Sequence, residues 1–435
     1  MRYANEISEI INEFSPEPLR TDQMDQFYCD DTMELRMGDK YSSPMEDIFD
    51  LCQDAESGKA FLLLGHRGCG KSTELNKISA EFEKKGYPVR TITCSTDLDL
   101  FNIVYSDLFI LMGDALLRIA VHFQCRIKEE LLHSIMDFWD EGNEIRVSRE
   151  IDEIGLEAGF STETPGILGN ILKLFAKINA DLKYNEETRK EYRKRISNRS
   201  SEWIRLLSLV AKEIVRKTKG KSPIIIFEDL DKLNPEDAWS VFYNYAAILS
   251  GMPFPIIYTF PIGLSYDSRF AAMDSYFITK TLPMIKIETI EGKLFLEGVD
   301  VIKEIVEKRA DLALFDAGVL ERLIRYTGGS LRDLFHAVNA SAKRAERRKS
   351  GTVSMEDAER ALEELQTSLT RRIEKKDYDF LLNIYRGNKE LIEDKEKLLK
   401  MLQASVVLEY NGKRWHNVHP LVARFLEEQG LSRHV

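Results

Sequence analysis

Two kinds of hydrophobic pattern alternate along the first 290 residues. Short runs in which every residue is apolar, such as 60–64 and 224–227, are typical of parallel strands buried on both faces. Elsewhere apolar residues recur every three or four positions, which predicts amphipathic helices. Short buried strands that alternate with helices predict an α/β fold with a parallel sheet.

Three further strands are expected, at 87–95, 254–264 and 282–288. The segment between the second strand and the strand at 224 is mostly helical in pattern, although 159–187 contains Gly and Pro breaks and is interpreted as an arm or hairpin. After 289 the pattern is helical. Beyond about 366 it predicts two helices, a hairpin turning at Asn411-Gly412, and a last helix.

Composition restricts the class of protein. The chain has 435 residues, which suggests several domains, and a net charge of −11, which argues against nonspecific nucleic-acid binding by the whole surface. Its five cysteines are scattered without a CxxC pair, and no run of 18 apolar residues occurs. We therefore expect a cytoplasmic protein without disulfides and without a membrane partner.

The segment GHRGCGKST, residues 65–73, follows the first apolar run directly. Glycines allow backbone N–H groups to surround phosphate oxygens, a lysine reaches the β- and γ-phosphates, and the following hydroxyl can bind Mg²⁺. A strand before the loop and an amphipathic helix after it are the context that this motif requires. The sequence thus predicts ATP and Mg²⁺ binding through Gly65, Gly68, Cys69, Gly70, Lys71, Ser72 and Thr73.

Acidic residues follow the apolar run 224–227 at the end where parallel sheets bind their ligands. Glu228 is expected to complete the Mg²⁺ site with Ser72. Asp229 is expected to polarise the water that attacks the γ-phosphate.

Together, GHRGCGKST and IIIFEDLDKL resemble the AAA+ and STAND ATPases of the ASCE P-loop class, particularly their origin-recognition branch. The resemblance covers roughly residues 36–100 and 221–365. It implies a sensor 1 role for Thr259, a sensor 2 role for Arg332 in TGGSLRDLFHAV, and an arginine finger at Arg269 in YDSRFAAMD. By the same analogy residues 30–53 lie near the adenine. In these families the first acid is usually Asp, so Glu228 places rapid hydrolysis in question.

The C-terminal pattern resembles the winged helix appended to many such ATPases. The expected division follows: 1–100 as a lead-in and first part of the ATPase core, 101–220 as a helical insertion, 221–289 as the second part of the core, 290–365 as a helical lid, and 366–435 as a winged-helix-like domain.

Three functions stay open at this stage. The first is an ATP-driven switch that forms nucleotide-dependent oligomers and regulates a separate effector protein, by analogy in bacterial antiphage defence. The second is a DNA-binding loader or initiator, which would contact nucleic acid through the winged helix or the basic helix 189–199. The third is a nucleotide-binding scaffold with little turnover, which the unusual Glu228 suggests.

Overall fold

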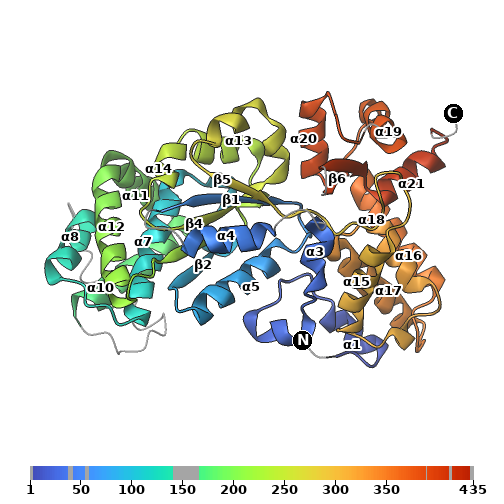
Figure 1. The fold of residues 1–435 in the computed structure, drawn as a ribbon, viewed down its shortest axis with the longest axis horizontal. Coiled ribbons are helices and arrows are strands. Elements are labelled where there is room, and N and C mark those ends of the chain that lie inside the picture. Colours follow the sequence, from blue (N-terminus) through green and yellow to red (C-terminus); the bar gives the residue numbers. More distant parts are fainter. Residues whose placement is uncertain are drawn as a thin grey trace.

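The computed structural model describes residues 3–37, 43–53, 58–140, 166–387, 389–410 and 414–431 (Figure 1). Its centre is a five-stranded parallel sheet in the order β2-β3-β4-β1-β5. The strands are β1 (Ala60–Gly65), β2 (Val89–Thr93), β3 (Ile224–Glu228), β4 (Ile256–Pro261) and β5 (Ile278–Thr281). The predicted α/β fold with a parallel sheet is confirmed.

Alternate residues of β1 belong to two different hydrophobic cores. Phe61 and Leu63 pack with side chains of α4 (Pro44–Gln53) and α5 (Lys71–Lys84), whereas Leu62 and Leu64 belong to the core that includes α7 (Tyr105–His122). Because successive strand residues point to opposite faces, an apolar run without interruption is what a doubly covered strand requires.

The helices between β2 and β3 form a layer beside the sheet, on the left in Figure 1. Besides α7 they are α8 (Glu129–Asp140), α10 (Ile167–Tyr184), α11 (Glu186–Asn198) and α12 (Ser200–Lys217). The expectation of an arm or hairpin was wrong for the described part of 159–187, because 167–184 is one helix. Five buried apolar residues at helical spacing hold α10 against its neighbours: Ile171, Leu174, Phe175, Ile178 and Leu182.

The basic residues of α11 hold this layer together. Arg193 binds the buried carboxylate of Asp107 at 2.6 Å, and Arg189 donates to the backbone oxygen of Leu182 at 3.2 Å. Arg199, which directly follows α11, binds Glu202 in the first turn of α12 at 2.7 Å. Three arginines of the predicted nucleic-acid surface are thus engaged within the protein.

The remaining helices before the lid are α1 (Ile7–Glu13), α2 (Met24–Phe27), α3 (Asp31–Met37), α6 (Cys94–Asp97), α13 (Pro235–Ala238) and α14 (Ala246–Ser250). The lid contains α15 (Leu296–Glu307), α16 (Val319–Tyr326), α17 (Leu331–Arg347) and α18 (Met355–Thr370). The N-terminal segment lies against the lid: Phe14 contacts Phe335 edge-on at 5.4 Å, and Ala4 pairs with Ala310. Figure 1 shows α1 beside the lid helices, on the same side of the sheet.

The last strand of the sheet is placed differently from the prediction. Residues 282–288 were expected to form it, but β5 is Ile278–Thr281. The N–H of Leu282 still bonds to Leu64 of β1 at 2.8 Å. Pro283 then has no N–H to donate, so the ladder stops, and Met284 instead donates to Glu409 at 3.5 Å.

The C-terminal domain has the element order of a winged helix: α19 (Tyr378–Arg386), α20 (Lys395–Gln403), β6 (Val407–Tyr410), β7 (Trp415–Val418) and α21 (Pro420–Glu428). The strands β6 and β7 pair antiparallel, as predicted, while their turn at 411–412 lies outside the described residues. All eight strand residues are buried. Leu408, Tyr410 and Trp415 share a hydrophobic cluster with Cys69 of the glycine-rich loop.

All five cysteines are buried and free. Among the described residues no helix combines the length and hydrophobicity that a membrane crossing needs.

A substitution of Gly113, which lies inside α7, tests how tightly the helical layer is packed. A Cβ at Gly113 would lie 2.5 Å from the Trp203 ring and 3.2 Å from Phe175. Overpacking costs about 1–3 kcal/mol, which exceeds the gain of about 1 kcal/mol that alanine brings to a helix. Gly113→Ala should therefore lower the thermal unfolding temperature. Gly351→Ala, where no atom lies within 4 Å, is the matched control. A stabilised Gly113→Ala protein would contradict this packing.

Candidate functional site

The loop between β1 and α5 has the conformation that its glycines permit. Gly68 and Gly70 have φ angles of 85° and 100°, in the left-handed region that a side chain disfavours. Gly70 is the N-cap of α5, so the helix begins at Lys71 with its unpaired N–H groups at this end of the cavity. Such a helix start attracts anions.

The lysine of the loop is paired with an acid that the sequence analysis did not select. Lys71 Nζ lies 2.9 Å from Asp231 Oδ2, and both side chains are largely buried. The ammonium group also donates to the backbone oxygens of Gly65 at 2.8 Å and His66 at 2.9 Å. Lys71 therefore has three oxygen partners before any ligand is considered.

The predicted metal ligands lie together. The Ser72 hydroxyl hydrogen-bonds to Glu228. Burial raises the pKa of Glu228 to about 7, and the neighbouring Asp229 and Asp231 add to this rise. Its Oε1 atom is buried without a hydrogen-bond partner in the described part of the chain. An unsatisfied carboxylate oxygen beside a serine hydroxyl fits Mg²⁺, which prefers oxygen ligands.

Asp229 has a strained backbone and two side-chain partners. Its φ of 70° is uncommon for a residue other than glycine, although Asp tolerates it better than most. Its carboxylate accepts a hydrogen bond from Ser95 and lies 2.7 Å from Lys232 Nζ. These contacts aim the group into the cavity beside the glycine-rich loop, which it lines.

Thr259 supports the acidic segment and does not line the cavity. Its hydroxyl accepts a hydrogen bond from the Leu230 N–H at 3.0 Å and donates to the Phe227 oxygen at 3.3 Å. Both partners flank Glu228 and Asp229. The residue predicted as sensor 1 thus fixes the backbone that carries the two acids.

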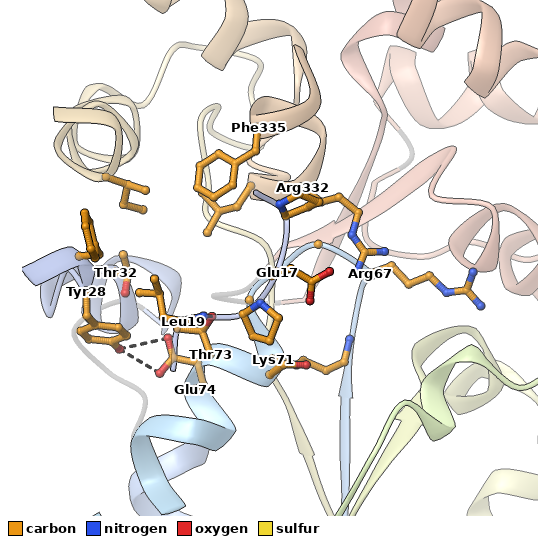
Figure 2. Close-up of a pocket in the computed structure, with 18 of the residues that line it drawn as sticks. Glu17, Leu19, Tyr28, Thr32, Arg67, Lys71, Thr73, Glu74, Arg332 and Phe335 are labelled. Carbon is orange, nitrogen blue, oxygen red and sulfur yellow. Dashed lines mark hydrogen bonds between the residues drawn. The ribbon is translucent and has the colours of Figure 1, made fainter. Parts of the chain in front are cut away.

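The lid reaches the glycine-rich loop through the start of α17. The Leu331 N–H donates to Gly68 at 3.1 Å, and a Cβ at Gly68 would lie 2.7 Å from the Arg332 Cβ. Gly68 therefore allows the lid to approach. Figure 2 shows Arg332 and Arg67 on the same side of the cavity as Lys71.

The cavity extends from the glycine-rich loop to the N-terminal segment and the lid. Its far end is lined by the N-terminal segment and the lid, including Leu19, Tyr28, Thr32 and Phe335 (Figure 2). There the Tyr28 hydroxyl donates to the carboxylate of Glu74, at 2.9 Å from Oε2. Burial raises the pKa of Glu74. Thr32 and Arg36 are the parts of 30–53 that line the cavity.

Arg269 lies away from this cavity. Its guanidinium binds Asp267 through two hydrogen bonds of 3.0 and 2.6 Å, and it lies 4.5 Å from the centre of the Trp239 ring. About half of its side chain is exposed. The predicted arginine finger is therefore on the surface of the chain and is not part of the chain's own site.

The winged-helix strands contact the back of the glycine-rich loop. Nε2 of His66 accepts a hydrogen bond from the Glu409 N–H at 2.8 Å. Burial lowers the pKa of His66 to about 4, so this imidazole is neutral and can accept. The Tyr410 hydroxyl donates to Gly328, just before α17, at 2.7 Å. Loop, lid and winged helix thus meet behind the site.

Sequence reasoning missed Asp231 and the segment 16–19. The spacing D-L-D in FEDLDKL shows a third acid, but nothing local says which acid faces Lys71. The Leu19 N–H donates to Thr73 Oγ1 at 3.2 Å, and the Leu19 oxygen accepts from Asn76 at 2.9 Å. A contact across more than 50 residues has no signal in the sequence.

Comparisons with known proteins give weak similarities. No protein-family model and no curated protein matches the sequence. Among solved structures, the Walker-type ATPase of Pyrococcus abyssi is 16% identical with a TM-score of 0.46, covering 95% of this chain and 99% of that one. Cdc6p from Pyrobaculum aerophilum is 13% identical with a TM-score of 0.38, covering 97% of both chains.

A third structure, Drosophila ORC bound to DNA, is 9% identical with a TM-score of 0.39, covering 96% of this chain and 89% of that one. Each TM-score is below 0.5. These similarities therefore assign no function to the chain.

The Lys71–Asp231 pair predicts how a change of one acid affects stability. Asp231→Asn leaves a buried ammonium group without its anion, and breaking such pairs costs about 3–5 kcal/mol. The empty protein should unfold at a temperature lower by at least about 5 °C. Mg²⁺ and ATP should then raise this temperature more than in the wild type, since phosphate oxygens would replace the lost carboxylate. Glu236→Gln, an exposed acid nearby, is the control. An unchanged unfolding temperature would exclude the pair as a stabilising element.

Proposed function

We propose that this chain is a Mg²⁺-dependent ATPase that works as a nucleotide-controlled switch. One observation carries the proposal: Lys71, the start of α5 and the Ser72–Glu228 pair converge at one cavity between the sheet, the N-terminal segment and the lid. Arg36, Arg67 and Arg332 also line this cavity, and none of them forms an ion pair with another described residue. The cavity wall has six Lys and Arg side chains against four Asp and Glu side chains, and this excess of positive charge favours a polyanionic ligand.

Each residue has a role in this mechanism. Lys71 exchanges its contact with Asp231 for the β- and γ-phosphate oxygens. Ser72 and Glu228 would hold Mg²⁺, which neutralises charge on the phosphates when bound. Asp229 orients the attacking water, while Thr259 keeps its backbone in place through Leu230.

The lid completes the proposed switch. Arg332 contacts the phosphates from α17, whose first N–H is bonded to Gly68. Because the winged helix contacts His66 and Gly328, occupancy of the loop can change its position. Nucleotide-dependent oligomers that use Arg269 in a neighbour's site, and regulation of a separate effector, belong to this same proposal.

DNA loading is the alternative function, and two features of the described residues weigh against it. The strands β6 and β7 are buried against the rest of the chain, and Arg189, Arg193 and Arg199 are engaged internally. These contacts reduce the basic surface open to DNA, while Lys190 and Lys194 of α11 and Arg414 of the winged helix remain exposed.

Lys71→Ala tests nucleotide binding. The change removes the ammonium group that stands at the start of α5 for the β- and γ-phosphates, and charge-assisted hydrogen bonds contribute about 1.5–3 kcal/mol each. ATP affinity measured by calorimetry should fall about 100-fold or more. Lys84→Ala, at the other end of α5, should bind ATP like the wild type. Equal ATP affinity in the Lys71 variant would disprove the phosphate site.

Asp229→Asn tests hydrolysis separately. An amide of the same shape cannot accept a proton from water, and general-base catalysis contributes about 10²–10⁴-fold. The variant should bind ATP with wild-type affinity while its steady-state turnover falls at least about 100-fold. Glu236→Gln should leave turnover unchanged. If Asp229→Asn turns over ATP at the wild-type rate, another group orients the water.

A further inference from the structure

Arg309 is a buried arginine at the far end of the cavity, away from Lys71. It follows α15 of the lid, is 3% exposed, and lines the cavity together with Tyr28 and Ile305. Its guanidinium carbon lies 5.6 Å from the centre of the Phe27 ring and 5.1 Å from that of Phe335. The group is therefore held between the N-terminal segment and the lid.

Arg309 has five N–H donors, and only the two on Nη1 have acceptors among the described residues. Nη1 donates to the backbone oxygens of Ile305 at 2.6 Å and Phe27 at 3.4 Å. Nε is buried and has no partner among the described residues, and no carboxylate there lies within ion-pair distance. Burial lowers the pKa of Arg309 to about 10, so it remains charged at neutral pH. A buried charged donor without an acceptor is costly.

A purely structural role explains only part of this arrangement. The two carbonyl contacts join the lid to the N-terminal segment, and a shorter side chain without charge could be buried there at lower cost. Neither contact accounts for the unpartnered Nε or for the place of Arg309 in the cavity wall. Nη2 also has no described acceptor and, unlike Nε, is not fully enclosed, so it is the donor that a ligand in the cavity can meet.

The chemistry of the cavity indicates which part of the ligand lies there. Figure 2 places Lys71, Arg67 and Arg332 on one side, and Tyr28, Thr32 and Glu74 on the other. A nucleotide with its phosphates at Lys71 would extend its base towards the second side. Apolar surfaces suited to a flat ring line that side: Pro18, Leu19, Phe27, Ile305 and Phe335.

We infer that Arg309 recognises the base of the bound nucleotide by donating a hydrogen bond to an acceptor nitrogen of the adenine ring. The inference depends on the proposed nucleotide site and adds a residue that determines specificity for the base. A planar guanidinium held by two backbone oxygens and near two aromatic rings has a fixed direction for its donors, which suits recognition of a ring edge. Arg309 has no part in the chemical step.

The test compares ATP with inorganic tripolyphosphate, which carries the phosphates without a base. Calorimetry would measure both dissociation constants for the full chain, for Arg309→Met and for Arg309→Lys. The wild type should bind ATP at least about tenfold more tightly than tripolyphosphate. Arg309→Met should lose about tenfold in ATP affinity, while its affinity for tripolyphosphate stays within about twofold. Arg360→Met, on the exposed face of α18, is the matched control.

Arg309→Lys carries the test if Arg309→Met does not fold. Lysine keeps the charge but lacks the planar fork, so ATP affinity should fall at least about threefold with no change for tripolyphosphate. A wild type that binds the two ligands equally, or variants in which both affinities change by the same factor, would overturn the inference. Lys71→Ala should weaken both ligands. If the wild type binds neither ligand, it is the proposed function itself that fails.

Discussion

The buried ammonium group of Lys71 requires a negative charge beside it, and the centre of this protein is built around that requirement. Lys71 begins α5 directly behind the sheet, where water cannot solvate its charge. In the structure Asp231 supplies the negative charge at 2.9 Å. Because two charges buried in a low dielectric depend on each other, the loop after β1 and the segment after β3 cannot move independently. A phosphate group can replace Asp231 only by supplying equal compensation.

Three distant parts of the chain meet the glycine-rich loop around this pair. The lid bonds to Gly68, the winged helix bonds to His66, and the N-terminal segment bonds to Thr73. The contacts use the Gly68 oxygen, the His66 imidazole and the Thr73 hydroxyl, and the positions of these groups depend on the loop conformation. A change in the loop when Lys71 changes partner would therefore reach three regions at once, which is the physical basis of a switch.

The two ends of the cavity differ in the charge and polarity of the side chains that line them. Near Lys71 the wall carries the cations Arg67 and Arg332, which form no ion pair with another described residue, beside the acids Asp229 and Asp231. At the other end apolar side chains line part of the wall, and Arg309 has donors without described acceptors. A nucleotide has this same polarity, with charge at one end and a flat ring bearing acceptor nitrogens at the other. The proposed base contact and the proposed phosphate contacts are thus complementary.

The sequence by itself determined the sheet class, the glycine-rich loop and the pairing of Ser72 with Glu228, because burial on both faces and helix-start chemistry leave local patterns. It predicted a last strand at 282–288, whereas Pro283 ends the ladder and the chain turns to β6. It also predicted an arm where α10 lies, because the Gly and Pro breaks before 167 obscured the helical spacing that follows. Only the tertiary structure decided that Asp231 faces Lys71, that Arg269 lies on the surface, and that Arg309 enters the cavity. Each of these depends on which segments meet across the fold, and no residue's own neighbours in the chain specify that.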